Sequence, residues 1–303
     1  MNYLFYVFIF ILGSAIGSFL NVIILRLRSG QVCRLATGED IVKKRSHCPK
    51  CGQVLRWSDL IPVVSFFILR GRCRDCKGKI SWQYPAVEAA TGLLFLAIFI
   101  FLFPELVEGF KILAFDFASL RSGDIIGVFY FLYLISSLVV IFVYDLRHYI
   151  IPDKVLFPAI GVALGYRIFD AFAINPFRPL LNLRGGEGEL LINALTIIYP
   201  YLLSAFVASA FFLLLILITR GRGMGLGDAK LAFLMGLILG WPNILFALFL
   251  AFFGGALFGV SLIILGRKTL KSQIPFGPFL IGGTIILLLF GQFFWEWQER
   301  IFF

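Results

Sequence analysis

Residues 190–218 read LLINALTIIYPYLLSAFVASAFFLLLILI and hold no charged side chain across 29 positions. A helix needs about 20 apolar residues to cross a hydrocarbon core of about 30 Å. An uncharged run of this length is typical of a membrane-spanning helix and exceeds what a helix in a soluble core requires. We therefore expect these residues to cross a bilayer.

The rest of the chain repeats this pattern. Apolar residues make up 60% of the sequence, with 36 phenylalanines, whereas soluble domains hold about 45–50% apolar residues. The mean hydropathy is +0.95. The sequence predicts an all-α polytopic membrane protein of about eight transmembrane helices, divided into a first helix (1–25), a cysteine-rich domain (26–83) and a membrane domain (84–303). The seven further spans are expected near 3–25, 84–103, 125–144, 151–174, 229–242, 244–265 and 274–292.

The basic residues indicate an orientation for these spans. The net charge is +10, and 21 of the 27 Lys and Arg residues fall in the loops 26–83, 145–154, 219–230 and 266–273. The positive-inside rule places these loops in the cytoplasm and explains the excess charge without a nucleic-acid partner. The opposite set holds the other six, which are Lys111, Arg121, Arg167, Arg178, Arg184 and Arg300.

The loop 26–83 contains all five cysteines, four of them in two CxxC pairs. Four thiolates complete a closed tetrahedral Zn²⁺ site, which is structural rather than catalytic. Two disulfides or four free thiols are the alternatives, and a reducing cytosol argues against disulfides. Iron is a further candidate for the metal. The predicted ligands are Cys48, Cys51, Cys73 and Cys76.

Four other residues near these pairs deserve separate interpretations. Gly52 and Gly78 follow the two pairs, where tight turns favour glycine. Cys33 is expected to be a bystander, and His47 is left without a role.

Four acidic residues are expected where spans meet the cytoplasmic surface, a costly place for a carboxylate. Asp228 follows two glycines and opens a span, so helix capping competes with catalysis as its role. For Asp153, directly after Pro152, capping is the favoured interpretation. Asp145 ends a helix, where the macrodipole disfavours an anion, so capping cannot explain it. The four are Glu88, Asp145, Asp153 and Asp228.

Two aspartates at one membrane face can share a proton, because adjacent like charges cannot both ionise cheaply. The ionised carboxylate then activates water, and the neutral one donates a hydrogen bond to the scissile carbonyl. The two histidines, His47 and His148, form no credible triad with the scattered serines. The residues therefore favour an aspartic peptidase.

The order of short motifs along nearly the whole chain resembles that of the prepilin leader peptidases, whose GxGD signature Gly225-Leu226-Gly227-Asp228 matches. The other matching segments are Gly17-Ser18-Phe19-Leu20-Asn21-Val22, the paired CxxC, Tyr84-Pro85-Ala86-Val87-Glu88, Asp145 with Ile151-Pro152-Asp153, and Pro275-Phe276-Gly277-Pro278.

This resemblance implies that Asp145 and Asp228 are the catalytic pair of an enzyme in the bacterial inner membrane. Its substrates would be type IV prepilins or secretion pseudopilins, cut after a glycine at the cytoplasmic face. The resemblance also implies methylation of the new N-terminus from S-adenosylmethionine. Some relatives carry a further acidic residue where this chain has Arg147, which puts a role for that extra acid in doubt.

Two other classes of function compete with a peptidase. An ion-coupled transporter also carries membrane acids, but it should place some of them near the bilayer centre. A non-enzymatic assembly factor would tolerate loss of Asp145 and Asp228. Glu88 is expected to pair with an arginine and fix the cysteine-rich domain to the spans, and Asn21 is either a polar contact between helices or part of a site. The sequence does not specify the pilin that is cut or the number of subunits.

Overall fold

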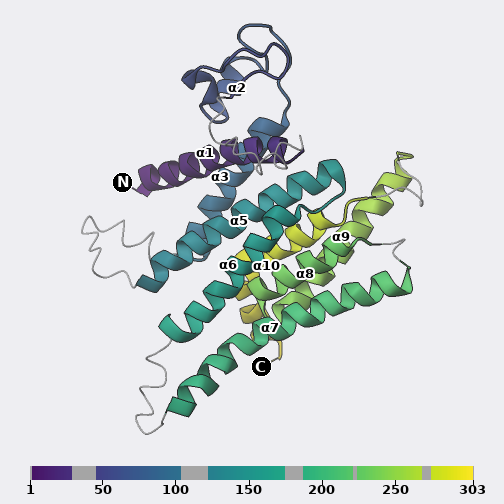
Figure 1. Cartoon of the computed structure of the whole chain (residues 1–303). Helices are drawn as coiled ribbons and strands as arrows, with labels where there is room; N and C mark the ends of the chain where they lie inside the picture. Colours follow the sequence, from purple (N-terminus) through teal and green to yellow (C-terminus); the bar gives the residue numbers. More distant parts are fainter. Residues whose placement is uncertain are drawn as a thin grey trace, which may run out of the picture. The chain divides into compact units, whose positions relative to one another are not determined.

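The computed structural model describes residues 2–28, 46–103, 122–174, 187–220, 224–267 and 274–302. The chain forms two compact units, Met1–Asp116 and Phe117–Phe303, and each is considered by itself. Figure 1 shows that both are built from helices. Cys33 and most of the loops at 104–124 and 175–189 lie outside the described residues.

The first unit is a pair of long helices with a small domain between them. Helix α1 (Asn2–Arg28) packs along α3 (Gln83–Phe101), and the connecting segment contains η2 (Trp57–Leu60) and α2 (Val64–Ile68). A Cβ atom at Gly13 would lie 2.8 Å from the Cα of Gly92 in α3. Small residues on α1 thus let the two helices approach closely.

The second unit is a bundle whose helices lie alongside one another (Figure 1). Helix α8 packs against α6, α7 and α10, and α10 also packs against α5 and α9. The elements are α5 (Ser122–His148), α6 (Asp153–Phe169), the π-helical turn η3 (Asp170–Ile174), α7 (Glu187–Ile218), α8 (Leu226–Leu239), α9 (Asn243–Ile264) and α10 (Gly277–Phe302).

A helix forms at each of the eight positions where a span was predicted, which confirms the all-α fold class. Six described helices are long and apolar enough to cross a membrane, so the chain is a multi-pass membrane protein. Helix α8 has only 14 residues. A short turn connects α8 to α9, with Gly240 at φ +69° ending α8 and Asn243 beginning α9.

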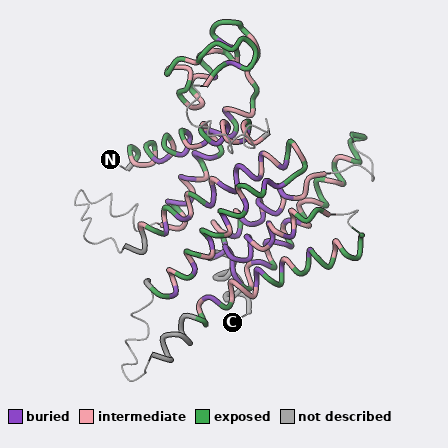
Figure 2. Tube along the Cα trace, viewed as in Figure 1, coloured by how far each residue is buried: buried purple, intermediate pink, exposed green. Residues whose placement is uncertain are grey.

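Helix α8 is buried among its neighbours, as Figure 2 shows for the middle of the bundle. Nine of its 14 residues are buried. The Ser204 hydroxyl of α7 donates a hydrogen bond of 2.7 Å to the carbonyl of Gly236. A Cβ at Gly236 would collide with the backbone of Ala205. The two helices therefore touch at the level of their main chains.

Arg167 has a different role from the loop charge that the sequence suggested. It lies in α6 and is buried, and its guanidinium donates to the carbonyls of Leu237 (3.0 Å) and Ile238 (2.5 Å). The same group lies 3.6 Å from the ring centroid of Tyr201. Because the last carbonyls of a helix lack partners within it, Arg167 caps the C-terminal end of α8.

Candidate functional site

Asp145 is a buried carboxylate in the last turn of α5. The residue is only 4% exposed. Its Oδ2 atom is buried and has no hydrogen-bond partner among the described residues. A buried polar group without a partner is costly and calls for an explanation. A catalytic role or a bound water molecule would explain such an atom.

Gly277, the first residue of α10, lies directly against this carboxylate. Its backbone N–H serves Asp145 as a hydrogen-bond donor. A Cβ atom at position 277 would lie 2.5 Å from Asp145 Oδ2, and no atom outside Asp145 appears among its three nearest neighbours. The glycine therefore leaves the space that the carboxylate occupies.

Asp228 lies in the first turn of α8, in the second unit as well. Its carboxylate accepts a hydrogen bond of 3.2 Å from the backbone N–H of Gly225. Gly225 is the N-cap and Asp228 is the third helical residue, so Asp228 is not itself the N-cap. Asp228 therefore caps the helix from its third position, as the acidic member of a capping box does.

Two contacts connect the surroundings of the two aspartates. A Cβ at Gly227 would lie 3.2 Å from Ile151, which follows α5 closely in the chain, so the turn before Asp228 packs on the segment after Asp145. Asp228 also lies close enough to Asp145 for the two charges to repel each other. The fold thus brings these two predicted site residues into one neighbourhood.

Asp153 forms an ion pair instead of the predicted N-cap. The N-cap of α6 is Pro152, and Asp153 is the first helical residue. Lys230 Nζ lies 2.8 Å and 3.0 Å from its two carboxylate oxygens. This exposed pair ties the start of α6 to the start of α8, two residues beyond Asp228.

Glu88 belongs to the first unit, and it has a structural partner. Its carboxylate accepts a hydrogen bond of 2.7 Å from the backbone N–H of Val63. The expectation that it fixes the cysteine-rich domain to the spans is met, but the partner found among the described residues is a backbone amide rather than an arginine. Asn21 donates to the carbonyl of Tyr84 at 3.2 Å and accepts from Gln83 at 3.4 Å, which makes it a polar contact between α1 and α3.

The four predicted metal ligands converge. Their sulfur atoms all lie within 4.8 Å of one another, and Cys48 and Cys76 are 3.9 Å apart. Four sulfurs at about 2.3 Å around a tetrahedral zinc are about 3.8 Å apart, so the set fits such an ion. All four are free thiols. Hydrogen bonds from the backbone of Cys51 and Lys50 lower the pKa of the Cys48 thiol to about 7, whereas, against a backbone hydrogen bond from Gln53, burial and the neighbouring thiols of Cys48 and Cys76 raise the pKa of Cys51 to about 11.

Each CxxC pair lies on a short turn, but the two turns use different residues. In the first, Gly52 adopts φ +72° and donates to the Cys48 carbonyl at 2.9 Å. In the second, Lys77 takes the equivalent place at φ +55° and donates to the Cys73 carbonyl at 3.1 Å. Gly78 was predicted to supply this turn, and that is wrong. A Cβ there would instead meet the Lys50 side chain at 2.6 Å.

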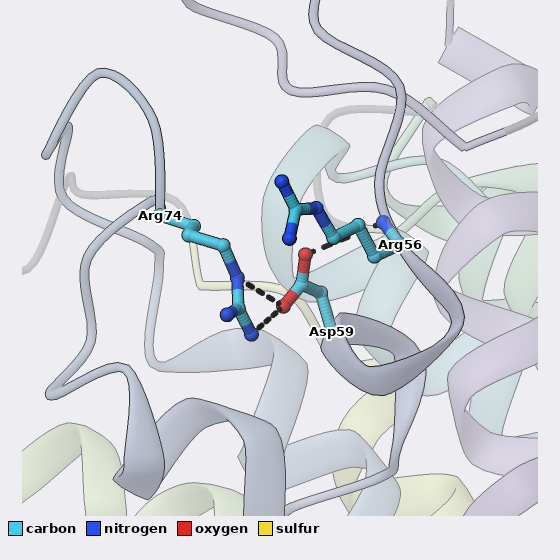
Figure 3. A network of polar contacts seen from close by, with 3 residues as sticks. All are labelled: Arg56, Asp59 and Arg74. Atoms are coloured by element: carbon cyan, nitrogen blue, oxygen red, sulfur yellow. Dashed lines mark hydrogen bonds and ion pairs between the residues drawn. The ribbon is translucent and has the colours of Figure 1, made fainter.

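An ion pair holds the second turn to η2, and Figure 3 shows it. The Arg74 guanidinium donates to Asp59 Oδ1 through Nε (3.0 Å) and Nη2 (2.6 Å). The backbone N–H of Arg56 donates to the other oxygen at 3.3 Å. Sequence reasoning missed this contact because charged residues are frequent throughout the loop, and nothing in their spacing marks the pair.

From the sequence, Gly277 could be recognised only as part of the motif Pro275-Phe276-Gly277-Pro278, and no role was predicted for it. A glycine between two prolines at a helix start was the available signal, but its significance depends on Asp145, which lies 132 positions earlier. Only the packing of α10 on α5 reveals it.

Each of the two units contains a stretch that matches a known protein family. Residues 11–102 match the bacterial peptidase A24 N-terminal domain, and residues 132–260 match the type IV leader peptidase family. No solved structure matches the chain.

Similar full-length relatives come from several bacteria, and each is a prepilin leader peptidase/N-methyltransferase. The protein from Bacillus subtilis is 30% identical over 94% of both chains. That from Aeromonas salmonicida is 32% identical over 98% of this chain and 94% of its own. That from Myxococcus xanthus is 32% identical over 89% of this chain and 68% of its own. Identity at this level across almost the full length shows that the chain belongs to the type IV leader peptidase family.

Proposed function

We propose that this protein is an aspartic endopeptidase that removes the short basic leader of type IV prepilins or pseudopilins after a glycine. Asp145 and Asp228 would be its catalytic carboxylates. Family membership supports the reaction class and argues against the transporter and the assembly factor. The observation that carries the assignment of the residues is the unpartnered, buried Oδ2 of Asp145 in the same neighbourhood as Asp228.

The chemistry follows from two carboxylates that share one proton. The ionised carboxylate takes a proton from a water molecule as the water oxygen attacks the scissile carbonyl carbon. The neutral carboxylate hydrogen-bonds the carbonyl oxygen as negative charge develops there. Transfer of a proton to the nitrogen then lets the peptide bond break, and this regenerates one neutral and one ionised carboxylate.

The surroundings of both carboxylates suit this reaction. Asp145 receives the N–H of Gly277 at the start of α10, and Asp228 receives the N–H of Gly225 at the start of α8. Helix N-termini present free N–H groups and a positive partial charge, which stabilise an anion. Each aspartate is therefore oriented by a backbone donor while keeping a second oxygen for substrate or water.

The cysteine-rich domain would hold a structural Zn²⁺ through Cys48, Cys51, Cys73 and Cys76. A closed four-thiolate site leaves no open position for water, so the metal would stabilise the fold of this small domain. The names of the relatives also support N-methylation of the new N-terminal residue from S-adenosylmethionine.

We place the protein in the bacterial inner membrane with the cysteine-rich domain and the aspartates facing the cytoplasm. The support for this orientation is the distribution of 21 of 27 basic residues in the loops on that side. A leader that stays in the cytoplasm while the following apolar segment stays in the membrane would meet the aspartates at this face.

The test is cleavage of a type IV prepilin by the purified full chain in detergent, with N-terminal sequencing of the product. Asp145→Asn and Asp228→Asn are nearly isosteric, and each is expected to abolish cleavage. Asp153→Asn is the matched control. It also removes a carboxylate near the start of α8, but one that forms an exposed ion pair with Lys230. Folded Asp145→Asn and Asp228→Asn proteins that still cleave would show that the catalytic pair is elsewhere.

A further inference from the structure

Residues 57–68, which we call the interfacial segment, expose many large apolar side chains. Trp57 is 81% exposed and Ile68 is 70% exposed. Exposed large apolar side chains gathered in one short segment are typical of a site of interaction. The remaining exposed apolar residues of the segment are Leu60, Ile61, Val64 and Phe67.

The middle of this segment lies beside the interior of a span. The backbone N–H of Val63 donates to Glu88 at 2.7 Å, and Glu88 is buried in α3. Helix α3 is apolar enough to span a membrane from Gln83 onward. Because a helix rises about 1.5 Å per residue, Glu88 lies about 7.5 Å beyond the start of this span. Val63 therefore lies deeper in the membrane than the first turn of α3.

Aromatic contacts place the end of the segment at the start of the same span. Trp82 directly precedes α3, the position at which tryptophan occurs in the aromatic belt of membrane proteins. The ring of Phe66 lies 4.7 Å from that of Trp82, and the ring of Phe67 lies 6.3 Å from it. Helix α2 thus lies at the level where α3 enters the bilayer.

The turn at the deepest point is strained and is held by the buried carboxylate. Val63 has φ +60°, and the N–H of Val64 donates to the carbonyl of Pro62 at 2.5 Å, which closes a three-residue γ-turn. This turn is rare and strained, above all for a β-branched residue. Such strain persists only where the surroundings impose it, and here Glu88 binds the N–H that the turn presents.

The charges around the segment complement anionic lipid headgroups. Arg56 precedes it, Arg70 and Arg72 follow it, and all three are exposed. The acidic residue within the segment, Asp59, is neutralised by Arg74. Apolar side chains flanked by basic ones are typical of segments that lie in the membrane interface.

We propose that the interfacial segment inserts its apolar side chains into the boundary between headgroups and acyl chains, and so docks the cysteine-rich domain on the bilayer surface. The partner is the lipid surface itself. The segment is connected to α3 through Glu88 and Trp82, and α3 exposes Leu93 and Ile100 as well. The apolar surface of the segment therefore belongs to the unit that already presents apolar side chains to lipid. This proposal does not rest on the aspartate pair.

The test uses the full chain reconstituted in vesicles of phosphatidylcholine and phosphatidylglycerol. The phosphatidylcholine is unbrominated, brominated near the headgroup, or brominated near the chain end. The fluorescence of Trp57 is obtained by subtracting the emission of Trp57→Phe from that of the wild type. The fluorescence of Trp82 is obtained likewise from Trp82→Phe. We expect shallow bromines to remove most of the emission of both residues, deep bromines to remove less, and aqueous iodide to have little effect.

A tryptophan placed at an exposed position next to the first CxxC pair, Gln53→Trp in the Trp57→Phe background, is the matched control. It should be quenched by iodide and not by brominated lipid. If Trp57 behaves like this control, the segment lies in water and the proposal is wrong. Protection of Trp57 from both quenchers would mean that protein covers the segment, which would equally overturn the assignment to lipid.

Discussion

Replacing Gly277 with alanine should disable the proposed peptidase without unfolding it. A Cβ at this position would lie 2.5 Å from Asp145 Oδ2, 3.2 Å from Cγ and 3.6 Å from Cβ of the same residue. A relaxed contact between carbon and oxygen is about 3.3 Å long, so the carboxylate or the helix start must move by about 0.8 Å. The added methyl group therefore acts on one side chain, which is the proposed catalytic one.

A displacement of about 1 Å at a catalytic group lowers a rate by about 100-fold, and this corresponds to about 2.7 kcal/mol of transition-state stabilisation. We expect kcat for prepilin cleavage to fall by this amount, while KM changes little because the leader and the apolar segment of the substrate bind elsewhere. Alanine is a better helix former than glycine by about 1 kcal/mol, so the substitution should not weaken α10.

The assay is cleavage of a prepilin by the purified protein in detergent, followed over a range of substrate concentrations. Gly282→Ala is the matched control in the same helix, because a Cβ there meets nothing within 4 Å. It should retain the kcat of the wild type. Thermal unfolding of both variants checks that the bundle is intact.

Wild-type kcat in Gly277→Ala would refute this reasoning, since the carboxylate would then tolerate the displacement. A parallel rise in KM and loss of thermal stability would point instead to a general disturbance of the bundle. If Asp145→Asn is inactive while Gly277→Ala is fully active, Asp145 keeps its proposed role and only the role of Gly277 is wrong.

Three further outcomes are expected. Cys48→Ser removes one of four converging thiols, so metal content measured by mass spectrometry should fall, whereas Cys33→Ser should keep the metal. Lys230→Met breaks an exposed ion pair with Asp153, which is worth at most about 1 kcal/mol, so unfolding in mixed micelles should change little, and a larger loss would contradict this interpretation. Arg167→Met leaves two buried carbonyl oxygens without their donor, so the free energy of unfolding should fall by about 3 kcal/mol, and a fall below about 1 kcal/mol would show that water or another group replaces the guanidinium.

The helices could be predicted from the sequence because each depends on a local property, an apolar run of sufficient length. The convergence of the four cysteines was equally accessible, since two CxxC pairs have few other uses at such spacing. Asp145 could be singled out because a carboxylate at a helix C-terminus has no local explanation. In each case the signal lies within a few neighbouring residues.

The contacts that the sequence could not supply connect distant positions. Arg167 could be counted as a loop charge because nothing near it in the chain reveals the end of α8, about 70 residues later. Asp153 has the local pattern of a helix cap, but its carboxylate pairs instead with Lys230 from another helix. The prediction for Gly78 failed for a different reason, because a turn can force Lys77 into the left-handed region when the surrounding hydrogen bonds fix it.

The short length of α8 has a consequence for hydrophobic matching. With 14 residues, this helix is about 21 Å long, whereas the hydrocarbon core is about 30 Å thick. Its residues 231–239 are mostly buried among α6, α7 and α10, so most of this short helix is covered by protein rather than by lipid. A helix of this length does not extend across the whole core, so its Asp228 end can lie deeper than the ends of the longer helices around it. A peptide bond at the edge of an apolar helix could reach that depth while the helix itself remains in the membrane.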